Sequence, residues 1–182
     1  MSTETMVLAA VLTAIVIVLQ LVGSFIRFGP FSVSLVLIPI VIGAATCGKW
    51  IGAWLGLIFG VAVLISGDAA AFLQISIPGT LITVLLKGIA CGLFAGLVYS
   101  LIEKKNKWIA VIAAAIVCPV VNTLVFILGC LVFFFDALAA GGFVDTLSYI
   151  ILTMVGANFL FELGFNMLLG PAIVRILNIR KK

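Results

Sequence analysis

The feature that most constrains this sequence is a series of long apolar runs, separated only by short polar stretches. A helix needs roughly 20 apolar residues to cross a bilayer hydrocarbon core of about 30 Å. Six such runs can be placed, at residues 6–24, 31–47, 50–65, 78–101, 108–134 and 147–176. The sequence therefore predicts an all-α integral membrane protein, built as a bundle of six transmembrane helices.

Composition excludes a water-soluble domain. Of the 182 residues, 65% are hydrophobic and only 9% are charged, and the mean hydropathy is +1.48. The longest polar stretch is residues 103–107, which leaves no room for a separate soluble domain. We expect residues 1–182 to form a single transmembrane domain, so that any energy source lies in a partner or a gradient.

Basic residues are distributed unevenly between the two sides of the predicted bundle. Lys49, the cluster at residues 104–107 and the C-terminal cluster at residues 175–182 fall on one side, and Arg27 falls on the other. Because basic loops stay in the cytoplasm, both termini are predicted to be cytoplasmic. The net charge of +4 is then a topology signal, and it gives no reason to expect nucleic acid as a partner.

Glycine recurs at four-residue intervals in the third and fourth runs. The glycines concerned are Gly48, Gly52, Gly56 and Gly60, and then Gly88, Gly92 and Gly96. Small residues along one stripe of a helix let two backbones approach closely in lipid. This spacing predicts close packing of these helices within the chain, and the short link at residues 48–49 predicts a tight helical hairpin between the second and third runs.

Two ionisable residues lie inside the predicted spans, Lys87 in the fourth and Glu162 in the sixth. Each costs roughly 3 kcal/mol or more at the bilayer centre, so both are candidates for function. They either pair with one another, which would be a structural role, or contact a ligand. The sequence leaves both interpretations open.

Further polar residues lie near the same depth. Asn158, Glu162 and Asn166 are four residues apart and share one face of the sixth helix. Asn122 follows Pro119 in the fifth span, where the proline interrupts the backbone hydrogen bonds. Asparagines can simply join helices by hydrogen bonds, but together with Lys87 these groups favour a ligand cavity.

The outer loops add a second group of candidate residues. Arg27 lies among phenylalanines after the first span, and Gln74 lies in the predicted outer loop at residues 66–77. Aromatic surface with a few polar groups is typical of a small-molecule site. An interfacial aromatic belt would explain the phenylalanines, but neither Arg27 nor Gln74.

Enzyme chemistry has little support in this sequence, because the chain has no histidine and so no Ser–His dyad or His-based acid–base pair. The stretch at residues 43–50 ends in Gly48-Lys49-Trp50, where a phosphate-binding loop needs serine or threonine in place of tryptophan. The four cysteines lie singly in apolar runs without metal-ligand spacing. We therefore expect no catalytic residue, no metal and no cofactor.

The whole chain resembles the S components of energy-coupling factor (ECF) transporters, the vitamin-capturing membrane subunits of prokaryotic uptake systems. The resemblance is carried by Ala10-Val-Leu-Thr-Ala14 in the first span and by the hairpin between residues 36 and 65. That hairpin contains Pro39-Ile-Val-Ile-Gly43 and Gly48-Lys-Trp-Ile-Gly52-Ala-Trp-Leu-Gly56. Six helices, cytoplasmic termini and the near absence of soluble mass agree with this family.

The resemblance implies a location in the prokaryotic plasma membrane and a set of partners. Ala10 and Ala14 would pack against a transmembrane scaffold (T) subunit that two cytoplasmic ATPases drive. A vitamin would bind near the outer face, and the residues here that fall at those places are Arg27, Gln74, Lys87, Asn122, Asn158 and Glu162. Lys87 with Arg27 favours an anionic vitamin such as pantothenate, while riboflavin, folate and pyridoxine-type ligands remain open.

Two other functional classes are compatible with parts of this sequence. A membrane scaffold of the cell-shape or division machinery can also have six helices, but it needs no polar interior. Convergence of Lys87, Asn122, Asn158 and Glu162 on one place would favour substrate capture over such a scaffold. A membrane enzyme would require pairs of acidic residues that the sequence does not place together.

Overall fold

The computed structural model describes residues 2–25, 27–28, 31–32 and 35–136, together with residues 159–160, 162–164 and 166–167 near the C-terminus. The elements in chain order are α1 (Thr3–Phe25), β1 (Arg27–Phe28), β2 (Phe31–Ser32), α2 (Leu37–Cys47), α3 (Lys49–Ser66), α4 (Ala70–Ile75), α5 (Ile77–Ile102) and α6 (Lys107–Phe133). The short pieces between residues 159 and 167 are helical.

Within the described residues, four helices are long and apolar enough to cross a membrane: α1, α3, α5 and α6. They correspond to the first, third, fourth and fifth predicted spans. The sixth predicted span, residues 147–176, lies mostly outside the described residues, so the count of six helices stays a prediction.

The second predicted span is corrected by the structure. Helix α2 begins only at Leu37 and has 11 residues, whereas the span was predicted to begin at residue 31. The residues before it form an antiparallel hairpin, in which Arg27 pairs with Ser32 and Phe28 pairs with Phe31. Phenylalanine fits a strand as well as a helix, and an apolar run this short does not distinguish the two.

The predicted outer loop at residues 66–77 also contains regular structure. Gly67 ends α3 in the left-handed region at φ 83°, a conformation that glycine adopts at little cost. The chain then enters α4, a helix of six residues of which none is buried. Ser76 caps the following helix by accepting a hydrogen bond from the Gly79 amide.

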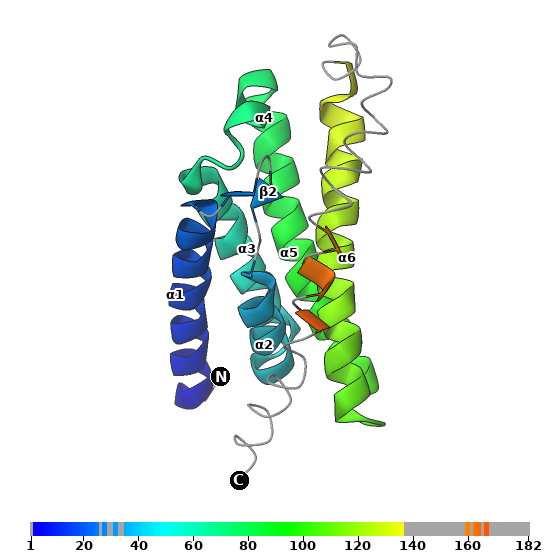
Figure 1. Ribbon diagram of the computed structural model, residues 1–182. Helices are drawn as coiled ribbons and strands as arrows, with labels where there is room; N and C mark the ends of the chain where they lie inside the picture. The colour runs from blue at the N-terminus through cyan, green and yellow to red at the C-terminus, as the bar shows by residue number, and fades with distance from the viewer. Residues whose placement is uncertain are drawn as a thin grey trace.

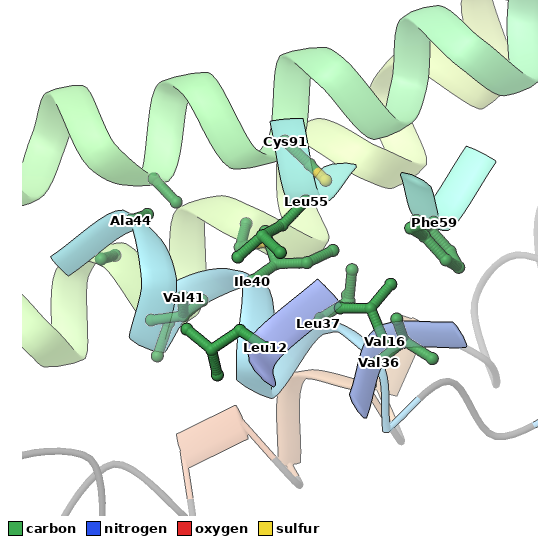
Figure 2. Close-up of a cluster of buried hydrophobic side chains, with 14 of the residues drawn as sticks. Leu12, Val16, Val36, Leu37, Ile40, Val41, Ala44, Leu55, Phe59 and Cys91 are labelled. Atoms are coloured by element: carbon green, nitrogen blue, oxygen red, sulfur yellow. The ribbon is translucent and has the colours of Figure 1, made fainter. Parts of the chain in front are cut away.

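Helix α5 lies between α3 and α6, and α1 packs on α3 and α2 along the side of the bundle (Figure 1). Apolar side chains from α1, α2, α3 and α5 meet in one core (Figure 2). Among those labelled in that view are Leu12, Val16, Leu37, Ile40, Val41, Leu55 and Cys91.

The glycine stripes form the contact between α3 and α5. A Cβ at Gly56 would overlap the carbonyl oxygen of Gly88, and a Cβ at Gly92 would overlap that of Gly52. The two backbones are therefore too close for any side chain at these positions. The prediction that the glycines serve packing within the chain is confirmed for these two helices.

Candidate functional site

Lys87 lies inside the bundle, ten residues after the start of α5 at Ile77, or about 15 Å along the helix. Its Nζ is 5.6 Å from the centre of the Phe59 ring on α3 and 5.2 Å from that of the Phe126 ring on α6. Such a cation–π contact is worth about 2 kcal/mol or more when the cation is shielded from water. The two rings lower the cost of placing this charge within the membrane.

Glu162 lies in the same region as Lys87. Its side chain is 2% exposed, and its carboxylate interacts electrostatically with the Lys87 ammonium. The structure thus brings together the two ionisable residues that the sequence placed inside separate spans. Each of the two opposite charges lowers the free-energy cost of placing the other inside the membrane.

Asn122 is buried on α6, one helical turn before Phe126. In the part of the chain that the structure describes, its Oδ1 accepts no hydrogen bond. Pro119 lies inside the same helix and has no amide to donate to the preceding turn. In a membrane helix such a proline is tolerated because neighbouring helices, hydroxyl side chains or water can satisfy the backbone carbonyl that it leaves unpaired.

Thr83 is a polar residue at this site that the sequence reasoning missed. It lies one turn before Lys87 and contacts Gly129 across the interface with α6. The hydroxyls of Thr13, Thr46 and Thr80 each donate to the carbonyl four residues earlier. The buried Thr83 hydroxyl has no partner among the described residues, and its four-residue spacing from Lys87 was a signal that could have found it.

Asn166 supplies a further polar group. Its Nδ2 donates to the Glu162 carbonyl at 2.8 Å, and its buried Oδ1 has no partner within the described residues. A buried polar atom without a hydrogen bond costs about 1–3 kcal/mol. The site thus combines the Lys87 cation with oxygens of Thr83, Asn122 and Asn166 that are unpaired in the described part of the chain. Such a combination is suited to a ligand that carries both an anionic group and hydrogen-bond donors.

The structure does not place the remaining predicted site residues, Gln74, Arg27 and Asn158, beside Lys87. Gln74 is exposed on α4, and the residue of α4 that reaches the site is Phe72, whose ring meets Phe126 edge-on at 5.4 Å. The backbone of Arg27 lies in β1, while its side chain lies outside the described part of the structure. Asn158 also lies outside the described residues.

Ala10 and Ala14, the predicted partner interface, are both exposed on α1. The opposite face of the helix is buried against α2 and α3 by Ala9, Leu12 and Val16. The two alanines therefore form a small-residue strip on the outward side of the bundle, where a second membrane helix could approach closely.

Comparison with protein families gives the identity of the chain. The family model described as ECF transporter, substrate-specific component, matches residues 4–174. The chain belongs to this family. This S component is accordingly a multi-pass membrane protein of a transport system, and its family is one of transporter components and not of enzymes.

The family match confirms the resemblance drawn from the sequence. It covers every element from α1 to α6 and also the residues that carry Glu162 and Asn166. Searches of curated proteins and of solved structures gave no match to this S component.

Proposed function

We propose that this S component captures a water-soluble vitamin at the outer face of the prokaryotic plasma membrane, as the substrate-binding subunit of an ECF-type ABC importer. The observation that carries the proposal is the Lys87 ammonium inside the bundle, with Phe59, Phe126 and Glu162 around it. A charge at that depth is costly, so an ionisable residue inside a span is by default a candidate for function. In a family of substrate-specific transporter components, substrate binding is the function that fits.

The polar groups around Lys87 favour pantothenate as the vitamin. Pantothenate has a carboxylate, which suits a lysine ammonium, and it has hydroxyl and amide donors, which suit the acceptor oxygens of Asn122 and Thr83. Arg27 would supply a second positive charge near the outer face. Riboflavin, folate and pyridoxine-type vitamins are the alternatives, and they differ from pantothenate mainly in the aromatic ring that the site would have to accommodate.

The partners follow from the same proposal. The exposed strip of Ala10 and Ala14 would pack against the T subunit, and two cytoplasmic ATPases would supply the energy for uptake. Residues 1–182 would form one transmembrane domain with both termini in the cytoplasm. The membrane-scaffold alternative receives no support from the family, whose described role is substrate-specific transport.

Titration calorimetry on the purified chain in lipid nanodiscs tests the proposal. Pantothenate, riboflavin, folate and pyridoxine would be titrated separately, and one of them is expected to bind saturably with one site per chain. The other three should neither bind nor compete, because a site built from specific hydrogen-bonding groups rejects ligands that leave those groups unpaired. Absence of saturable binding for all four would contradict the vitamin proposal.

A further inference from the structure

Lys49, at the start of α3, packs on the last turns of α5. A Cβ at Gly96 would lie 2.5 Å from the Lys49 Cα, so the lack of a side chain there lets the lysine backbone rest directly on α5. The Lys49 Nζ lies 5.9 Å from the centre of the Trp50 ring, and the Trp50 side chain is 73% exposed. The ammonium of Lys49 therefore lies on the outer surface of the pair formed by α3 and α5.

A row of residues on α5 continues from this contact. Gly96, Ser100 and Lys104 are four residues apart, so they share one side of α5 and of the turn that follows it. Glu103 keeps helical backbone angles at the end of α5, with φ −57° and ψ −29°, so the row extends to Lys104. Both Ser100 and Lys104 are exposed. The row is about 12 Å long, with one lysine beside each end.

The two lysines approach Ser100 from opposite directions. A Cα–Cβ bond tilts toward the start of its own helix, and α3 and α5 are antiparallel, because their glycine stripes pair in opposite order. The Lys49 side chain thus leaves α3 toward the end of α5, and the Lys104 side chain leaves the end of α5 back toward Ser100. One phosphate group near Ser100 is within reach of both ammonium groups.

The acidic residue of this turn is held on a different row of α5. The Tyr99 hydroxyl donates a hydrogen bond to the Glu103 carboxylate, and the Tyr99 side chain is only 5% exposed. Glu103 is therefore directed toward Tyr99 and does not lie between Lys49 and Lys104. The two positive charges remain available to an anion from outside the chain.

Apolar surface adjoins the two charges on the membrane side. Trp50 and Trp54 are one turn apart on α3 and are 73% and 48% exposed, and Leu101 on α5 is 75% exposed. Tryptophan is typical of the headgroup level of a bilayer, where lysine attracts anionic lipids. Two cations, a hydroxyl and an apolar wall match the phosphate, the headgroup and the acyl chains of one phospholipid.

We propose that Lys49, Ser100 and Lys104 bind the headgroup of an anionic phospholipid, whose acyl chains lie along Trp50. The phosphate lies between the two ammonium groups. Ser100 Oγ already donates to the Leu97 carbonyl at 2.8 Å, so its lone pairs are left to accept a hydroxyl of the headgroup, as phosphatidylglycerol offers.

This lipid site is separate from the candidate site at Lys87. Gly96 comes nine residues after Lys87, or about 14 Å farther along α5. The turn between α5 and α6 lies at the end of the bundle where α2 meets α3, opposite to the end with α4 (Figure 1). The lipid site therefore does not depend on the proposed function.

Trp50 provides a native reporter of the neighbouring lipid. The chain has three tryptophans, so Trp54→Phe with Trp108→Phe leaves Trp50 alone. Bromine on a lipid chain quenches tryptophan fluorescence at close range. Nanodiscs would contain phosphatidylglycerol and phosphatidylcholine in varied proportions, with one of the two brominated. The salt concentration would be about 0.3 M, where exposed charges more than about 6 Å apart are largely screened.

We expect phosphatidylglycerol to occupy the place beside Trp50 at least about tenfold more strongly than phosphatidylcholine, because each lysine near the membrane surface contributes about fivefold in affinity. Lys49→Gln and Lys104→Gln should each lower this preference about fivefold, and the double variant should leave almost none. Lys105→Gln is the matched control. It removes the same charge from an exposed residue of the same turn, but outside the row, so the preference should stay within about twofold.

Three results would overturn the lipid site. The first is equal quenching by the two brominated lipids, and the second is an equal loss of preference in Lys105→Gln and Lys104→Gln, which would indicate a diffuse basic surface. The third is displacement of brominated phosphatidylglycerol by millimolar glycerol 3-phosphate, which would indicate a site for free phosphate. If Lys49→Gln does not fold, Lys104→Gln against Lys105→Gln decides, because both residues lie in the turn after α5. Vitamin binding enters none of these measurements, so a failure of the proposed function leaves the lipid site unaffected.

Discussion

Replacement of Lys87 by methionine is expected to weaken vitamin binding about tenfold to hundredfold, the equivalent of one charge-assisted contact of about 1.5–3 kcal/mol. Methionine has a similar length and can pack against the rings of Phe59 and Phe126 through its sulfur. The change also removes the cost of a charge inside the membrane. We therefore expect the loss of affinity to exceed the loss of stability, as measured by calorimetry and by melting temperature.

A purely structural role for Lys87 predicts a different pattern. If Lys87 only neutralises Glu162, the single change would leave a buried carboxylate uncompensated, at a cost of about 3–5 kcal/mol in stability. Lys87→Met combined with Glu162→Gln would then restore both stability and full binding. Full binding by a stable double variant would remove Lys87 from the site.

Lys49→Met is the matched control for the Lys87 variant. Lys49 also lies over an aromatic ring, with its Nζ 5.9 Å from the centre of the Trp50 ring. It lies at the start of α3, away from the candidate site. Its replacement removes a positive charge and a cation–π contact to the exposed Trp50 ring, so it should leave vitamin affinity unchanged.

Ala14→Trp is expected to abolish vitamin uptake while leaving binding to the isolated subunit intact. A close contact between small residues tolerates no added volume, and Ala14 is exposed on α1, on the side opposite the buried core. Uptake of radiolabelled vitamin into cells with the complete transporter would be measured beside calorimetry on the isolated chain.

Ile15→Trp is the control for that experiment. Ile15 is also exposed and lies about 100° around the helix from Ala14 at nearly the same depth, so the same bulk there should face lipid and permit uptake. If Ala14→Trp abolishes binding in the isolated subunit while assembly with the T subunit stays normal, the interface assignment is wrong.

The spanning helices could be predicted because lipid imposes one simple rule on length and polarity. The hairpin of β1 and β2 and the short helix α4 could not. Phe31 and its neighbours suit a strand or a helix equally, although Gly29-Pro30 is a turn signal. A helix of six residues is too short for its apolar period to be recognised. The cytoplasmic orientation of the termini stays a prediction.

The site could be predicted only in part. Lys87 and Glu162 were found because a charge in a span is expensive. Their aromatic neighbours Phe59 and Phe126 could not be found, because contacts between helices depend on rotation and depth that a single sequence does not specify.

The central claim is that this S component binds a small molecule at Lys87, and the most direct test is mass spectrometry of what the purified chain retains. The protein would be produced in cells grown with all four vitamins, washed in detergent and denatured, and the released molecules identified. We predict one vitamin in near one-to-one amount with the wild-type chain and little of it with Lys87→Met. No retained vitamin, or equal amounts with both proteins, would contradict the claim.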